Sequence, residues 1–123
     1  MGQRFVKEGT GWRLGWDESS SSPYQGLLAG SSWAIELTAE EFRDFCRLTQ
    51  QLTQTMATMA SELMDEERIT CEAESNLMWL EADGFPEAFA LRFIVQSGRG
   101  CEGGWPASAS REVLQAITQL SVF

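Results

Sequence analysis

The spacing of apolar residues changes at Thr38, and this change limits the folds open to the chain. Before it, two runs place an apolar residue at every second position: Trp12, Leu14 and Trp16, then Trp33, Ile35 and Leu37. Such alternation is typical of half-buried strands. After it, Thr38 is followed three residues later by Glu41, the spacing of a capping box that opens a helix. We therefore expect strands up to residue 37 and a helix from residue 39.

Two further strands are expected before the helix. The stretch 24–29 is apolar enough for a strand, and the stretch 4–7 has the composition of a short edge strand. Loop composition separates these elements, with a polar run at 17–23 and a turn at Gly30-Ser31-Ser32. Four strands thus precede the helix.

The expected helix runs from 39 to about 64, and it is uncharged between Arg47 and Glu62. Its apolar positions recur every three or four residues: Phe42, Phe45, Leu52, Met56, Met59 and Leu63, with Thr49 in one place of the series. One interpretation buries it on two sides, against its own sheet and against another helix or a second subunit. An oligomer contact would then involve Thr49, Leu52, Met56 and Met59. The other interpretation is a mildly polar exposed face.

The strand pattern returns after the acidic connector at 65–67. Strands over 68–74 and 77–83 flank Ser75-Asn76, which predicts a two-residue hairpin. In that register Glu74 faces Leu77, Glu72 faces Trp79 and Thr70 faces Glu81. One face of the hairpin is then entirely apolar and belongs to the core: Ile69, Cys71, Ala73, Met78, Leu80 and Ala82.

A third strand and a second helix complete this half. In the stretch 88–96, alternate apolar residues point one way and Arg92 points the other way, as in a strand. A glycine turn at 98–100 then leads to a short strand at 101–105. Pro106 suits the first turn of a helix. We expect one α+β domain spanning 1–123. It contains two antiparallel meanders of three to four strands, each followed by a helix.

The glycines at 98, 100 and 103 spell G-x-G-x-x-G, a pattern found in dinucleotide-binding loops. That fingerprint requires a parallel strand, a helix starting at once and an acidic residue about 20 positions on. Here the loop joins two expected antiparallel strands and residue 118 is Thr. The motif does not predict a bound nucleotide.

Composition narrows the classes of function. The chain has 18 acidic and 9 basic residues, a net charge of −9 and no histidine, so phosphate backbones are repelled and the commonest proton-transfer and metal-binding side chain is absent. Three separated cysteines, Cys46, Cys71 and Cys101, encode neither a disulfide framework nor a zinc site. The acidic run at 65–67 lacks the ligand spacing of a calcium loop. We expect a cytosolic protein without a membrane span, metal or cofactor.

Several blocks of the chain resemble a small cyanobacterial family of unknown function: residues 11–17, 33–38, 65–75 and Gly84-Phe85-Pro86. The resemblance covers nearly the whole chain. It implies a fold similar to the Whirly-type regulators that bind single-stranded DNA, with repeated units of four strands and a helix. The basic DNA-contacting character of those proteins has no counterpart at any matched position here.

The expected outward face of the second sheet carries Trp79 among Glu72, Glu74 and Glu81, with Arg92 on the next strand. A Trp among charges is a plausible anchor for a protein partner, because Trp and Arg are enriched at interface hot spots. The alternative is that a helix or the other sheet covers Trp79 and that the charges form ordinary cross-strand pairs. Glu72 and Glu81 as an acid and base pair would require a cleft that the sequence does not indicate.

Three hypotheses follow for the function. The first is a non-catalytic acidic module that binds another protein or assembles as a homodimer through the helix. The second is a Whirly-like binder of single-stranded nucleic acid, which the net charge of −9 opposes. The third is an enzyme that uses carboxylates or Cys101. The sequence names neither the partner nor the pathway.

Overall fold

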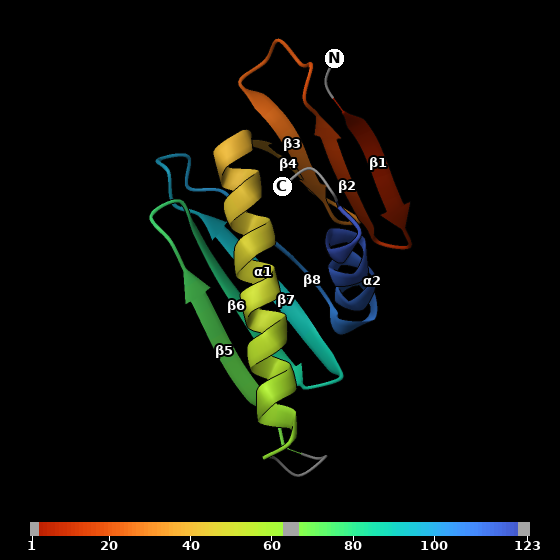
Figure 1. The fold of residues 1–123 in the computed structure, drawn as a ribbon, viewed down its shortest axis with the longest axis vertical. Coiled ribbons are helices and arrows are strands. Elements are labelled where there is room, and N and C mark those ends of the chain that lie inside the picture. Colours follow the sequence, from red (N-terminus) through yellow and green to blue (C-terminus); the bar gives the residue numbers. More distant parts are fainter. Residues whose placement is uncertain (1–2, 63–66, 121–123) are drawn as a thin grey trace.

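The computed structural model describes residues 3–62 and 67–120, which form two sheets and two helices in the arrangement of Figure 1. Each sheet has four antiparallel strands in sequential order, and a helix follows each sheet. The expected α+β class and the two meander-plus-helix units are confirmed. The elements are β1 (Arg4–Gly9), β2 (Trp12–Asp17), β3 (Tyr24–Ala29), β4 (Ala34–Thr38), α1 (Ala39–Ala60), β5 (Ile69–Glu74), β6 (Met78–Phe85), β7 (Ala88–Val95), β8 (Glu102–Trp105) and α2 (Ala107–Thr118).

Helix α1 begins with the predicted capping box. The backbone N–H of Glu41 donates to Thr38 Oγ1 at 3.2 Å, and the backbone N–H of Thr38 donates to Glu41 Oε1 at 2.9 Å. These two bonds satisfy donors that a helix start otherwise leaves unpaired. The helix ends at Ala60, and the expected last turn at Leu63 lies outside the described residues, as does most of the 65–67 connector.

Helix α1 lies across the molecule and packs on both sheets, as Figure 1 shows. Its Phe42 and Phe45 side chains are fully buried. The Phe45 ring joins a cluster of four aromatic rings from both halves of the chain, whose measured centroid distances lie between 5.3 and 5.9 Å: Trp33, Phe45, Phe93 and Trp105. Within the cluster, Trp105 Nε1 of β8 donates to the backbone oxygen of Ala29 on β3 at 2.9 Å. This aromatic cluster, which we call the aromatic seam, packs the two sheets against each other.

The register of the β5–β6 hairpin differs from the expected one. Glu74 lies opposite Trp79, Glu72 opposite Glu81 and Thr70 opposite Asp83. The pairing is therefore shifted by two residues, and the reversal is centred on Asn76 and Leu77. An even shift keeps every side chain on its expected face, so Met78, Leu80 and Ala82 are fully buried as predicted.

Ser75 explains the shift. A tight turn centred on Ser75-Asn76 would require positive φ at its first residue, and no described non-glycine residue has one. The Ser75 hydroxyl instead accepts the N–H groups of Leu77 and Met78, each at 3.1 Å, and donates to Asp44 Oδ2 of α1 at 2.5 Å. This side chain fixes the turn one residue further along.

The residues expected at an oligomer contact on α1 mostly face the core of their own chain. Thr49, Leu52 and Met56 are at most 2% exposed, because they pack into the core of their own chain, and Met59 is half-buried. The uncharged residues on the other side of the helix are exposed: Gln50, Gln51, Thr53, Gln54, Thr55, Ala57 and Thr58. This side of α1 is therefore a mildly polar exposed face, while the rest of the helix packs on the sheets and on α2.

Replacing Gly26 with Ala should destabilise the fold, because a Cβ at this position of β3 would lie 2.4 Å from the Phe42 ring. We expect a loss of about 2 kcal/mol in the free energy of unfolding, measured by urea denaturation. The matched control is Gly15→Ala on β2, where the new Cβ would meet Leu27 at an ordinary 3.4 Å. Equal stability of the two variants would contradict the packing of α1 on the first sheet.

Candidate functional site

The outward face of the second sheet carries all five residues that the sequence analysis singled out there. Strand alternation places Glu72 and Glu74 on β5, Trp79 and Glu81 on β6, and Arg92 on β7, all on the face opposite the buried side chains. Figure 1 shows α1 on the inner side of this sheet. Glu72, Glu74 and Arg92 are exposed, whereas Trp79 and Glu81 are half-buried. We call these five residues the Trp79 face.

Arg92 connects the aromatic and acidic parts of the Trp79 face. Its guanidinium carbon lies 5.1 Å from the centroid of the Trp79 ring, within the range of a cation–π contact. Its Nε lies 3.9 Å from Glu81 Oε1, across the directly opposed pair of β6 and β7. An exposed ion pair of this length contributes little stability, so Arg92 can change partners at low cost.

The negative charges of the acidic side chains on β5 have fewer positive partners nearby. Glu72 lies directly opposite Glu81, and like charges in that position repel. Glu74 accepts a hydrogen bond from Gln96 Nε2 at 3.0 Å, which brings no positive charge. The β5 side of the Trp79 face is therefore an acidic surface.

Asp83 extends this surface toward the start of β5. It accepts hydrogen bonds from Arg68 Nη2 and Thr70 Oγ1, both at 2.8 Å. Together with the charge of Arg68, these bonds lower the pKa of the Asp83 carboxyl, so the group is ionised at neutral pH. Sequence reasoning missed Arg68 and Asp83 as members of this face, although the expected register also puts them opposite each other on its outward side.

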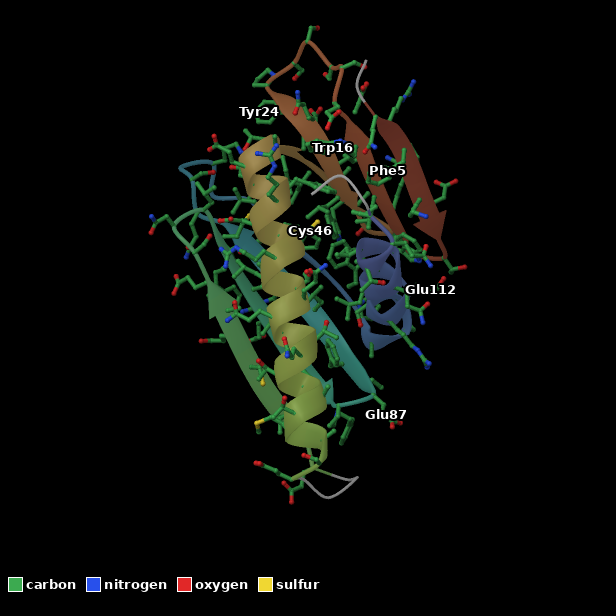
Figure 2. All side chains as sticks on the ribbon, in the orientation of Figure 1. Phe5, Trp16, Tyr24, Cys46, Glu87 and Glu112 are labelled. Atoms are coloured by element: carbon green, nitrogen blue, oxygen red, sulfur yellow. The ribbon has the colours of Figure 1, made fainter. Side chains whose placement is uncertain are left out.

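A well-formed cleft lies elsewhere. It has a volume of about 490 Å³ and is lined by α1, α2 and the β6–β7 turn, with Thr53, Glu87, Phe89, Arg111 and Leu114 among its residues. Figure 2 shows Glu87 at this turn. None of the five residues of the Trp79 face lines it. The carboxylate pair Glu72 and Glu81 therefore stands on an open sheet surface, where water is not excluded.

The cysteines offer no activated thiol at this face. Burial raises the pKa of Cys46 to about 12, so its thiol stays protonated. Cys71 lies on the inner side of β5, and Cys101 precedes β8; both are half-buried. Within residues 3–62 and 67–120, no group of three potential metal ligands is close enough to hold an ion.

The G-x-G-x-x-G stretch forms a turn that reaches the first sheet. Gly98 and Gly100 have φ values of 97° and 64°, a conformation that favours glycine, and Arg99 lies between them in the β7–β8 connection. Arg99 Nη1 donates to the backbone oxygen of Glu36 on β4 at 2.6 Å, and its guanidinium carbon lies 4.8 Å from the Tyr24 ring centroid. The stretch therefore links the two sheets.

Glu41 is the buried partner of this turn. Arg99 Nη2 donates to Glu41 Oε1 at 2.5 Å, and Ser97 Oγ donates to Oε2. Burial acts to raise the pKa of Glu41, but the hydrogen bonds from Ser97 and Thr38 and the charge of Arg99 outweigh it, so the pKa is lowered. The sequence shows Glu41 as part of a capping box and gives no signal for a contact 58 residues away.

Comparisons with known proteins agree with this architecture. Residues 7–120 match the family described as "Domain of unknown function (DUF1818)". The chain belongs to this family. A solved structure from Prochlorococcus sp. NATL2A, described as a protein of unknown function from the DUF155 family, is 30% identical, with a TM-score of 0.86. That match covers 93% of this chain and 96% of the other.

The resemblance to a family of unknown function is thus confirmed, whereas the similarity to Whirly-type regulators stays a prediction. No match was found among the curated proteins. Among the described residues, no helix is long and apolar enough to cross a membrane.

The Glu41 cluster predicts a specific pH dependence of stability. Because the folded pKa of Glu41 lies below its ordinary value of 4.5, its contribution is present above that pH and is lost as the pH falls through the lower, folded pKa. Glu41→Gln should cost about 2 kcal/mol at pH 7, and its difference from the wild type should shrink below the ordinary pKa.

Denaturation curves across this pH range check the prediction. The matched control is Glu40→Gln at the exposed neighbouring position, which should cost less than about 1 kcal/mol. A constant difference between Glu41→Gln and the wild type down to acidic pH would contradict the assigned carboxylate cluster.

Proposed function

We propose that this chain is a non-catalytic, acidic protein-binding module with a regulatory or assembly role in a cyanobacterial cell. The Trp79 face is its docking surface. The observation that supports this proposal best is the position of Trp79: a large aromatic side chain stands half-buried on the outward side of a rigid sheet, between Arg92 and a row of carboxylates. Trp and Arg are the side chains most enriched at the energetic centres of protein interfaces.

The energetics favour contact with a partner over an internal structural role. An exposed cation–π contact contributes about 0.5–1 kcal/mol to the stability of the fold. Burying a Trp at the centre of a protein interface commonly contributes about 2 kcal/mol or more to binding. The face is preorganised, because its backbone belongs to a four-stranded sheet whose other side is core. Little ordering entropy is then lost on association.

Replacing Trp79 with Ala should abolish binding to the partner while leaving the fold intact. We expect the free energy of unfolding to fall by no more than about 1.5 kcal/mol, since only the outward packing is lost. The measurement is affinity purification from the native host with wild-type and variant protein as baits, read by mass spectrometry. A partner recovered with the wild type should be missing with Trp79→Ala.

The matched control is Val6→Ala, which removes an exposed apolar side chain, 58% accessible, from the first sheet. It should retain the partner. If wild type and Trp79→Ala recover the same proteins in the same amounts, the docking role of this face is wrong.

Binding of single-stranded nucleic acid is the competing function, because a half-buried Trp beside an Arg can still stack on bases. The carboxylates of Glu72, Glu74 and Glu81 stand where phosphates would pass, and the net charge is −9. We therefore expect no binding of a fluorescently labelled single-stranded DNA even at low salt, measured by anisotropy. Binding that appears at low salt and weakens as salt rises would favour this second function instead.

A further inference from the structure

We propose that the partner docks as an extended segment that adds a strand to the free edge of β5, with basic side chains alternating with apolar ones. This inference rests on the proposed function and specifies the chemistry of the partner. Three observations support it: the hydrogen-bond pairing of β5, the charges beside its edge, and features of the other sheet edges that make them less suited to binding a strand.

The pairing pattern shows which backbone groups of β5 are free. Ser75 N–H donates to the backbone oxygen of Met78 at 2.8 Å, which places the directly bonded pairs at Ala73 with Leu80 and Cys71 with Ala82. The intervening residues turn their N–H and C=O groups away from β6. They are Thr70, Glu72 and Glu74, and β5 is the end strand of its sheet.

The side chains of these same residues lie on the Trp79 face. A residue of an added strand that pairs with Glu72 or Glu74 would place its own side chain beside that carboxylate, because opposed residues share a face. Glu72 already faces the like charge of Glu81. A Lys or Arg at this position of the partner removes that repulsion, and the net charge of −9 attracts a basic segment over a longer range.

The intervening residues of the added strand would face the other way, beside Cys71 and Ile69. Both side chains are only partly buried, although they pack against the core. Apolar partner side chains would cover this strip next to α1, which packs on β5. The predicted segment therefore alternates basic and apolar residues.

The other sheet edges are less suited to this mode of binding. At β4, the Arg99 guanidinium already donates a hydrogen bond to the backbone oxygen of Glu36. β8 has only four residues and ends before Pro106. β1 carries Arg4 and Lys7 as well as Glu8, so it presents no uniform charge. β5 has neither a bulge nor a proline to protect it, and edge strands without such devices readily accept a further strand.

The test uses a capped peptide of alternating Arg and Val, about six residues long, titrated into the full chain labelled for backbone amide NMR. We expect shifts centred on Thr70, Glu72 and Glu74, and slower hydrogen exchange at these amides. A peptide of alternating Glu and Val should not bind. Shifts confined to other elements would overturn the proposal.

Four variants, compared in two pairs, separate strand addition from general attraction of charge. Reversing Glu72 and Glu74 to Arg should weaken binding at least about tenfold, whereas reversing the exposed Glu18 and Glu87, with the same change in net charge, should leave it within about threefold. Glu72→Pro should bind at least about threefold more weakly than Glu72→Gln, because only proline also removes the free N–H. Equal effects within either comparison would overturn strand addition.

The outcome is distinguishable from failure of the proposed function. If the peptide does not bind but Trp79→Ala still abolishes recovery of the host partner, docking at the Trp79 face stands and the β5 edge is wrong. If the peptide binds at β5 while Trp79→Ala recovers the same partners as the wild type, the edge is confirmed and Trp79 is not the anchor.

Discussion

The packing of α1 between the two sheets is the interaction on which the rest of the structure depends. Phe42 covers Gly26 on the first sheet, and Phe45 joins Trp33, Phe93 and Trp105 in the seam between the sheets. Because α1 and α2 together cover the inner side of both sheets, neither sheet needs a second layer on its outward side. The exposure of Trp79 is therefore a consequence of how the core is built.

The turn that carries Arg99 serves the same arrangement from outside the core. Its Arg99 pairs with Glu41 at the start of α1 and with the backbone of the edge strand β4, so one side chain joins both sheets and the helix. A charged pair with little exposure stabilises only when its hydrogen bonds are complete. Here Ser97 and Thr38 supply the remaining donors to the Glu41 carboxylate. The glycine pattern that resembles a nucleotide-binding loop thus forms the turn whose Arg99 connects the second sheet to β4 and α1.

Much of this fold could be predicted from alternation and capping, because these signals depend on neighbours close in sequence. Thr38 and Glu41 marked the start of α1, and the alternating runs placed the strands and the two faces of the second sheet correctly. The register of β5 against β6 could not be predicted, since it depends on Ser75 bonding to Asp44 on α1. The burial of Thr49, Leu52 and Met56 inside the chain could not be predicted for a related reason: an apolar stripe on a helix suits a contact within the chain as well as one with a second subunit. For the candidate surface, the sequence identified Trp79, Glu72, Glu74, Glu81 and Arg92 as sharing a face, but the corrected register was needed to see which backbone groups of β5 are free.

The central claim is that β5 ends its sheet with an uncovered edge beside the Trp79 face. Residue-resolved hydrogen exchange on the protein without a partner tests it most directly. We expect slow exchange for the amides of Cys71 and Ala73, which donate to β6, and fast exchange for those of Thr70, Glu72 and Glu74, which point outward. Equal protection of all five amides, or the reverse pattern, would show that this edge is covered or that the register is wrong.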